Sequence, residues 1–260
     1  FFLHILFPKG TGFVFNMNKL LKGLRGIMRN EEEITLSPHL REKTILVVGA
    51  QTSAGTQICK RLAEEHHKLA LACETKMDSL NALSKDLIEK GATVNLFQFS
   101  LGDEENIKDV VEGTIGQFDS LDALVLALEE PFIGDIDNVD PTSLIQSSLD
   151  ANYFTHIYFT YFALPYLRKC RGKVILLSSF NEEVQSNENA IFYATRGATL
   201  AFFETLQEEE SGISVIIVHG ANTHPRELAD DGSHIAASNS NANNDADIRN
   251  SANLVITASR

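Results

Sequence analysis

The sequence has 260 residues, with 35 acidic against 22 basic side chains and a formal net charge of −13 at pH 7. A chain of this length can bury one sizeable core without disulfides or metals to stabilise it. The acidic balance excludes a general nucleic-acid surface, because such surfaces neutralise phosphates with clustered Lys and Arg.

Residues 1–30 differ from the rest of the chain because they contain five basic side chains and no acidic one. In a helix, Leu20, Leu24 and Ile27 would lie on one face and Arg25 and Arg29 on the other. Such a basic amphipathic helix suits an anionic membrane surface or a targeting role, and a surface helix on the domain is the alternative. We therefore separate residues 1–40 as a basic N-terminal extension.

The first strand–helix unit lies in residues 44–62. Residues 45–48 are an unbroken apolar run, which predicts a parallel strand buried on both faces. From Ser53 onward, apolar side chains recur every three or four residues and predict a helix. The turn between them reads Gly49-Ala50-Gln51-Thr52-Ser53-Ala54-Gly55. Such a turn places N–H groups and the positive end of a helix around one point, which suits a pyrophosphate; an ordinary structural turn is the alternative.

Strands and helices alternate through the rest of the domain. The further predicted strands are residues 69–73, 93–99, 123–128, 174–177 and 213–218. The further predicted helices are residues 77–89, 106–118, 141–168 and 190–210. Strands separated by helices of this length require crossovers, so the pattern predicts an α/β fold with a parallel sheet covered on both faces, within residues 41–224.

The C-terminal part of the chain changes in composition. Residues 225–246 are rich in Asn, Ser, Asp and Ala, which predicts a long polar mobile loop. Residues 247–260 are expected to form one more helix, and no seventh strand follows. The three cysteines lie far apart and the eight histidines have no metal-ligand spacing, so no metal site is predicted. His66-His67 is expected to be a solvated pair at a helix end.

Three segments of the second half carry a resemblance to a known family. Asn152 stands inside a long apolar helix, where Asn is unfavourable; a surface Asn is the alternative to a special role. Residues 172–179 read GKVILLSS, a strand that ends at Ser179. Tyr193 follows fourteen residues later, in the segment FYATRGA. Together with the glycine turn, these segments resemble the short-chain dehydrogenase/reductase family over residues 30–259.

The resemblance implies a Rossmann-type doubly wound sheet whose last strand is missing, and a catalytic set of Asn152, Ser179 and Tyr193. In that family the tyrosine exchanges a proton with the substrate oxygen, the serine holds that oxygen, and a lysine four residues after the tyrosine supports both. Here the lysine position is Gly197. Arg196 lies about 100° around the helix from that position, so it is not a simple replacement.

The cofactor implied by the resemblance is NAD or NADP. The residues that would bind it are Gly49, Gln51, Ser53, Ala54, Gly55, Glu74, Gly220 and Thr223. Glu74 favours NAD, because a carboxylate there would repel a 2′-phosphate and accept from a ribose hydroxyl. Ser53 stands where the family has a glycine, and Glu129 adds a negative charge near the expected cleft.

A finer resemblance is to the membrane-anchored hydroxysteroid dehydrogenases of the endoplasmic reticulum. It is carried by Asn30-Glu31-Glu32, by Leu124-Val125-Leu126 and by Ala163-Leu164-Pro165. It implies a steroid-like or other lipid substrate, pairing as a homodimer, and association with that membrane through residues 1–30; a cytoplasmic protein is the alternative.

Two hypotheses about function follow. In the first, the protein is an oxidoreductase that interconverts an alcohol and a carbonyl, weakened by the loss of the lysine. In the second, it is an inactive relative whose fold serves binding or contact with a partner. Asn152, Ser179 and Tyr193 favour the first hypothesis, and Gly197, Ser53 and Glu129 favour the second.

Overall fold

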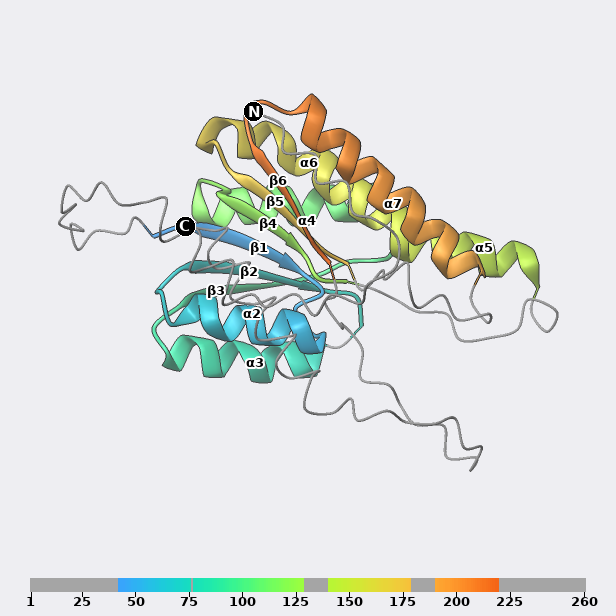
Figure 1. Cartoon of the computed structure of the whole chain (residues 1–260). Coiled ribbons are helices and arrows are strands. Elements are labelled where there is room, and N and C mark those ends of the chain that lie inside the picture. Colours follow the sequence, from blue (N-terminus) through green and yellow to red (C-terminus); the bar gives the residue numbers. More distant parts are fainter. Residues whose placement is uncertain (1–41, 76, 129–139, 179–189, 220–260) are drawn as a thin grey trace, which may run out of the picture. The chain divides into compact units, whose positions relative to one another are not determined.

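The computed structural model describes residues 42–75, 77–128, 140–178 and 190–219, all within the compact unit that begins at Glu42 (Figure 1). Six parallel strands form one sheet in the order β3-β2-β1-β4-β5-β6. The strands are β1 (Thr44–Val48), β2 (Lys68–Cys73), β3 (Thr93–Gln98), β4 (Ala123–Leu126), β5 (Lys173–Ser178) and β6 (Ser214–His219). The sheet confirms the predicted α/β fold.

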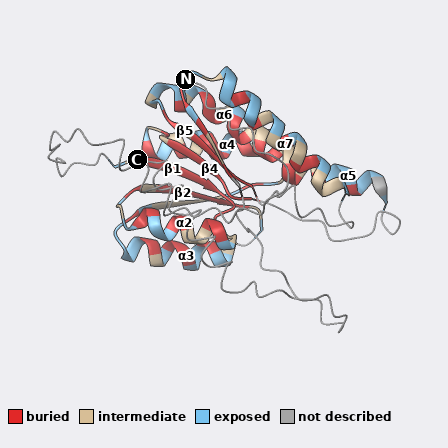
Figure 2. Cartoon of the chain, viewed as in Figure 1, coloured by how far each residue is buried: buried red, intermediate tan, exposed pale blue. Residues whose placement is uncertain are grey.

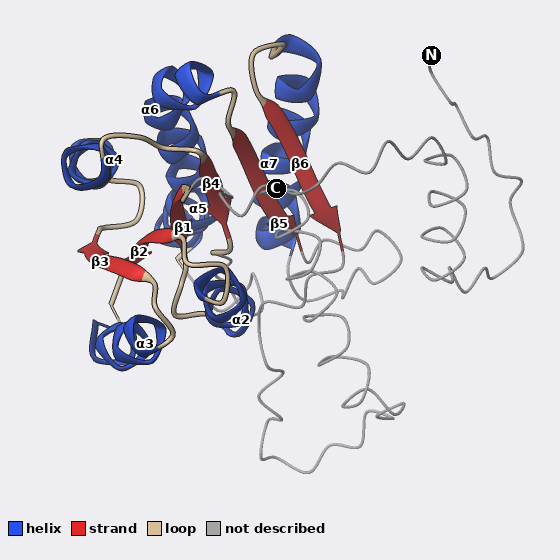
Figure 3. Cartoon of the chain, turned by 90° about the vertical axis from the view of Figure 1, so that its left-hand side faces the viewer, coloured by secondary structure: helices blue, strands red, loops and turns tan. Residues whose placement is uncertain are grey.

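The helices form two layers on the two faces of the sheet (Figure 3). They are α2 (Ser53–Ala63), α3 (Met77–Glu89), α4 (Glu104–Phe118), α5 (Pro141–Leu149), α6 (Thr155–Cys170) and α7 (Ala190–Glu209). One core cluster joins side chains of α2 and α3 to one face of the strands, and a second joins α4, α6 and α7 to the other face. Helices on both faces are the arrangement that the alternating pattern predicts.

The apolar strand runs explain the buried sheet (Figure 2). Every residue of β1 and β4 is buried, which is expected of central parallel strands with helices on both faces. Neighbouring strands are aligned so that Val48 of β1 pairs with Ala72 of β2 and with Leu126 of β4. The carboxyl ends of these three strands therefore reach the same edge of the sheet.

The predicted helix over residues 141–168 is interrupted. The structure divides it into α5, a π-helical turn (Asp150–Phe154) and α6, which continues to Cys170. Apolar periodicity alone cannot detect such a turn, because one extra residue barely disturbs the pattern. The start of α4 also differs from the prediction: Asp103 accepts a hydrogen bond from the N–H of Asn106, so the helix begins at Glu104.

His67 corrects the expectation of a solvated histidine pair. Its side chain is buried and its Nε2 lies 3.5 Å from a carboxylate oxygen of Glu65. The error arose because α2 ends at Ala63, so that His67 directly precedes β2 and faces the protein interior.

Several predicted segments lie outside the described residues: the N-terminal extension, the polar loop over 225–246 and the C-terminal helix over 247–260. Within the described part, no helix is both long enough and apolar enough to span a bilayer. The expectation that no seventh strand follows β6 also falls on residues that the structure does not describe.

Candidate functional site

The strand order reverses direction between β1 and β4. From β1 the chain winds outward through β2 to β3, and it then returns to β4 and winds the other way to β6. In open α/β sheets, ligands bind in the crevice beyond the carboxyl ends of the strands at such a switch point. The glycine turn that follows β1 lies at this point (Figure 1).

The glycine turn is packed too tightly to accept side chains at its two glycines. Gly49 has φ +80°, and a Cβ added to it would lie 2.7 Å from the main-chain nitrogen of Leu128. A Cβ at Gly55 would collide with the main-chain oxygen of Gly49. Thr52 caps α2 by accepting from the N–H of Gly55 at 3.0 Å and donating to the oxygen of Gly49 at 2.8 Å. Both glycines are therefore required by the backbone fold itself.

The residues between the two glycines differ in how far their side chains are exposed, and an exposed one would meet a ligand. Ser53 is exposed, so its side chain occupies space in front of the turn and not inside the protein. Ala54 behind it is buried in the core. The carbonyl oxygen Oε1 of Gln51 is buried and has no hydrogen-bond partner. The backbone thus fits a dinucleotide, with extra bulk at the exposed Ser53, whereas the acceptor of Gln51 is enclosed by the protein.

Glu74 follows β2 at the same edge of the sheet. Its side chain is half-buried, and its main-chain oxygen accepts a hydrogen bond from Nε2 of Gln98 at 3.0 Å. This bond ties the end of β2 to the end of β3. On its other side β2 pairs with β1, the strand that leads into the glycine turn. The position agrees with contact to the ribose of a dinucleotide bound at the switch point.

Asn152 is fully buried inside the π-helical turn, so the alternative of a surface Asn is wrong. Its main-chain oxygen accepts a hydrogen bond from Oγ1 of Thr199 on α7 at 2.5 Å. π-helical turns occur often at functional sites, because they displace one turn of a helix. Here the displaced turn is joined directly to the helix that carries Tyr193.

Tyr193 lies in the first turn of α7 and its side chain is half-buried. Ser178, the last residue of β5, is buried, and the predicted Ser179 comes directly after it, outside the described residues. Gly220, Thr223 and Glu129 also lie outside the described residues. A Cβ built at Gly197 would meet no atom within 4 Å, so the position of the missing lysine has room for a side chain.

Arg196 is the main residue whose placement sequence reasoning missed. Its side chain is 1% exposed, and its Nη2 donates to Oγ of Ser178 at 3.2 Å and towards the main-chain oxygen of Leu177 at 3.4 Å. A signal was present in the sequence. Arg196 lies on the same helical stripe as Thr199 and Phe203, which face the sheet.

His156 is the second missed residue. It lies one turn after Asn152, is fully buried, and its Nε2 donates to the main-chain oxygen of Leu128 at 3.0 Å in the neutral form. Burial, and then the nearby charge of Arg196, lower the pKa of His156 from 6.5 to about 3. The ring is therefore neutral at physiological pH. Its spacing of four residues from Asn152 was visible in the sequence, but nothing there distinguished it from a core histidine.

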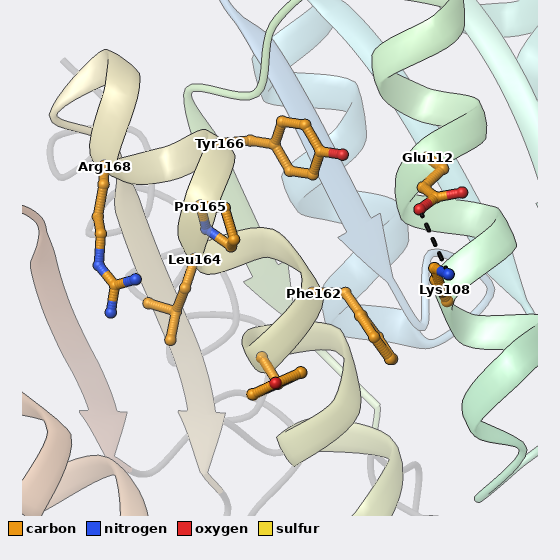
Figure 4. A pocket seen from close by; sticks show the side chains of 8 residues that line it. Lys108, Glu112, Phe162, Leu164, Pro165, Tyr166 and Arg168 are labelled. Carbon is orange, nitrogen blue, oxygen red and sulfur yellow. Dashed lines mark ion pairs between the residues drawn. The ribbon is translucent and has the colours of Figure 1, made fainter.

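A separate hollow of about 370 Å³ lies between α4 and α6 (Figure 4). Phe162 and Tyr166 of α6 point towards α4, where Lys108 and Glu112 form an ion pair at 3.8 Å. None of the residues predicted for the site lines this hollow. Among the described residues, no three His, Cys, Asp or Glu side chains are grouped as metal ligands.

Comparison with known proteins gives a family match over most of the domain. A family model described as short chain dehydrogenase matches residues 43–234. This range includes the glycine turn, the π-helical turn, β5 and α7.

Curated relatives include plant hydroxysteroid dehydrogenases. The chain is 29% identical over 170 residues to "11-beta-hydroxysteroid dehydrogenase-like 2" of Arabidopsis thaliana, covering 65% of this chain and 55% of that protein. It is 25% identical over 227 residues to "11-beta-hydroxysteroid dehydrogenase A" of Sesamum indicum, covering 83% of this chain and 63% of that protein. The chain thus spans less than two thirds of the length of these relatives.

Solved structures share the fold. A dehydrogenase/reductase from Sinorhizobium meliloti matches with a TM-score of 0.69 and 20% identity, covering 83% of this chain and 87% of that one. An alcohol dehydrogenase from the archaeon Thermococcus sibiricus, complexed with 5-hydroxy-NADP, matches with a TM-score of 0.63 and 17% identity, covering 68% and 75%. At these identities the likeness is one of fold.

Proposed function

Because the chain belongs to the short-chain dehydrogenase/reductase family of oxidoreductases, we propose that it interconverts an alcohol and a carbonyl on a steroid-like or other lipid substrate, using NAD(H). The lipid substrate is supported by the resemblance to plant hydroxysteroid dehydrogenases. The proposed catalytic rate is low, because no lysine occupies position 197.

One observation supports the catalytic set. The hydrogen bond from Thr199 to the oxygen of Asn152 joins α7 to the π-helical turn, and Arg196 of the same helix bonds to Ser178 at the end of β5. These bonds join α7, which carries Tyr193, to the turn that carries Asn152 and to the carboxyl end of β5, after which Ser179 follows in the sequence. Separate elements converging on one edge are what a catalytic site of this fold requires.

The proposed roles follow from the chemistry of each group. Tyr193 transfers a proton to or from the substrate oxygen, and the hydroxyl of Ser179 holds that oxygen by a hydrogen bond. Asn152 fixes the turn that faces them. When bound, the dinucleotide supplies or accepts the hydride. Without a cation at position 197, the tyrosinate is less stabilised, and each 1.4 kcal/mol lost slows the reaction about tenfold.

The residues proposed to hold the dinucleotide are those of the glycine turn, Glu74, and Gly220 with Thr223. The tight backbone at Gly49 and Gly55 supports this assignment. The carboxylate of Glu74 supports NAD over NADP, since it would repel a 2′-phosphate.

A second candidate function is a binding protein without turnover. The observation that favours it is which positions of the glycine turn have kept a glycine and which have not. The two glycines that the backbone requires are present, whereas the position that a ligand would approach is the exposed Ser53. Relaxed selection for dinucleotide binding would produce this pattern while the fold is maintained.

The deciding experiment is titration of the purified chain with NADH and NADPH, read by NADH fluorescence and by melting temperature. A ligand that binds the native state must raise that temperature. Saturable NADH binding, followed by NADH formation from NAD and an 11β-hydroxysteroid, would support the oxidoreductase. No temperature shift with either dinucleotide at about millimolar concentration would support the binding protein.

A further inference from the structure

We propose that Arg196 is a positioning residue that holds the first turns of α7, and with them Tyr193, against the carboxyl end of β5. The inference deepens the proposed oxidoreductase and rests on it for its catalytic meaning. The contact itself is a property of the fold and can be measured without turnover.

The burial of Arg196 is unusual enough to need a reason. Arginine is among the residues that are rarely fully buried, because removing its charge from water is costly. In this chain Arg196 is 1% exposed and is the largest fully buried side chain among the described residues. It lies between α7, which carries Tyr193, and the end of β5. A residue that is costly to bury and lies at that point has a local structural task.

Two hydrogen bonds of Arg196 indicate that task. Its Nη2 reaches Oγ of Ser178 at 3.2 Å and the main-chain oxygen of Leu177 at 3.4 Å. Both acceptors belong to the last two residues of β5, directly before Ser179. The planar guanidinium presents its donors in a fixed geometry, so it sets direction as well as distance. It thereby ties the helix to the strand end that leads into the predicted catalytic serine.

Tyr193 is positioned by the same contact. It lies three residues before Arg196, which places the two side chains on successive turns of α7. One turn later, Thr199 bonds to the oxygen of Asn152. Two consecutive turns of α7 are thus bonded to the end of β5 and to the π-helical turn that carries Asn152. Arg196 orients the helix by its bonds to β5. Gly197 beside it has no side chain that could contribute to this orientation.

The test compares variants of the full chain. Arg196→Met keeps much of the length but removes the donors and the charge, and Arg196→Lys keeps the charge without the planar fork. Ser178→Ala removes the acceptor of one of the two Arg196 bonds, leaves the guanidinium in place, and is the second variant if Arg196→Met does not fold. Phe203→Leu is the matched control, because Phe203 is fully buried on the same stripe of α7 and belongs to the core cluster.

Four quantities are measured for each variant: NADH affinity, kcat and KM for oxidation of an 11β-hydroxysteroid, and the rate of amide hydrogen exchange. In Arg196→Met, kcat should fall by about tenfold to a hundredfold with a smaller change in KM, as expected when Tyr193, which accepts the proton of the alcohol in this direction, is misplaced. Amides at the end of β5 and in the first turns of α7 should exchange about tenfold faster than in the wild type. Arg196→Lys should recover part of kcat, and Phe203→Leu should lower the melting temperature while keeping kcat within about threefold.

The outcomes separate this inference from the proposed function. Unchanged kcat and unchanged local exchange in both Arg196→Met and Ser178→Ala would overturn it, as would an equal loss of kcat in Phe203→Leu. If the wild type neither binds NADH nor turns over, the proposed function fails, and exchange alone decides the inference. If exchange in Arg196→Met is then faster only at the β5 end and the start of α7, the inference about Arg196 stands. If exchange changes uniformly over the protein, the inference is wrong.

Discussion

The hydroxyl of Thr199 donates to the main-chain oxygen of Asn152 at 2.5 Å and so joins α7 to the π-helical turn. Both residues are fully buried. A π-helical turn disturbs the regular pairing of main-chain carbonyls, so a side-chain donor at this point satisfies an acceptor that water cannot reach. The distortion of the helix and the position of α7 are therefore one structural feature.

Thr199→Val should destabilise the protein by about 1–3 kcal/mol, because it keeps the shape of the side chain but leaves a buried acceptor without this donor. Urea unfolding measures the change. Thr205→Val is the matched control, since Thr205 lies on the same helix, is exposed, and donates to the oxygen of Ala201 at 2.9 Å. The control should change stability by less than about 0.5 kcal/mol. Equal losses in both variants would contradict a special role for the bond to Asn152.

Gly197→Lys should raise the rate of NADH formation by about tenfold or more, because it restores a cation one turn from Tyr193. The position has room, since no atom lies within 4 Å of a Cβ built there. Gly116→Lys in α4 is the matched control, because its Cβ also meets nothing within 4 Å. Both variants should gain about 1 kcal/mol of helix stability. A rate that rises in neither variant would show that position 197 does not limit catalysis.

Most of the fold could be predicted from the sequence because buried parallel strands and their helices have distinct periodicities. The apolar run of β1 and the period of α3 were sufficient to place both elements. The π-helical turn could not be predicted, because it adds one residue to an otherwise continuous helix. Its energetic support comes from Thr199, which lies 47 residues away in the chain.

The site was predictable only in part. Asn152 was expected to have a special role because Asn disfavours a helix interior, and its complete burial supports that expectation. The direction of Arg196 could not be predicted, because only the packing of α7 on β5 determines which side of the helix is enclosed. Ser179 was inferred from the end of its strand and lies just beyond the described part of that strand.

Ser53→Gly should tighten NADH binding several-fold, because Ser53 is exposed at the point where a pyrophosphate would approach the turn. The fold should tolerate the change, since the side chain makes up no part of the core clusters. Ser53→Ala separates bulk from hydrogen bonding: it should give little gain if the Cβ is the obstacle, and most of the gain if the hydroxyl is. Weaker binding in both variants would instead indicate that the hydroxyl donates to the ligand.

His156→Gln should reduce the loss of stability that acid causes. Burial holds the pKa of His156 at about 3 against 6.5, so between these values the unfolded chain binds a proton that the folded chain does not. The free energy of unfolding therefore falls as the pH drops below 6.5, by at most about 1.4 kcal/mol per pH unit. Gln keeps a donor for the oxygen of Leu128 without titrating, and Arg196 stays charged throughout.

Urea unfolding at about pH 7 and about pH 5 measures the free energy of unfolding of both proteins. The difference in favour of the wild type should shrink at the lower pH, and the effect of His67 on that free energy is common to both proteins. A constant difference between the two proteins would mean that folded His156 takes up its proton like an exposed histidine.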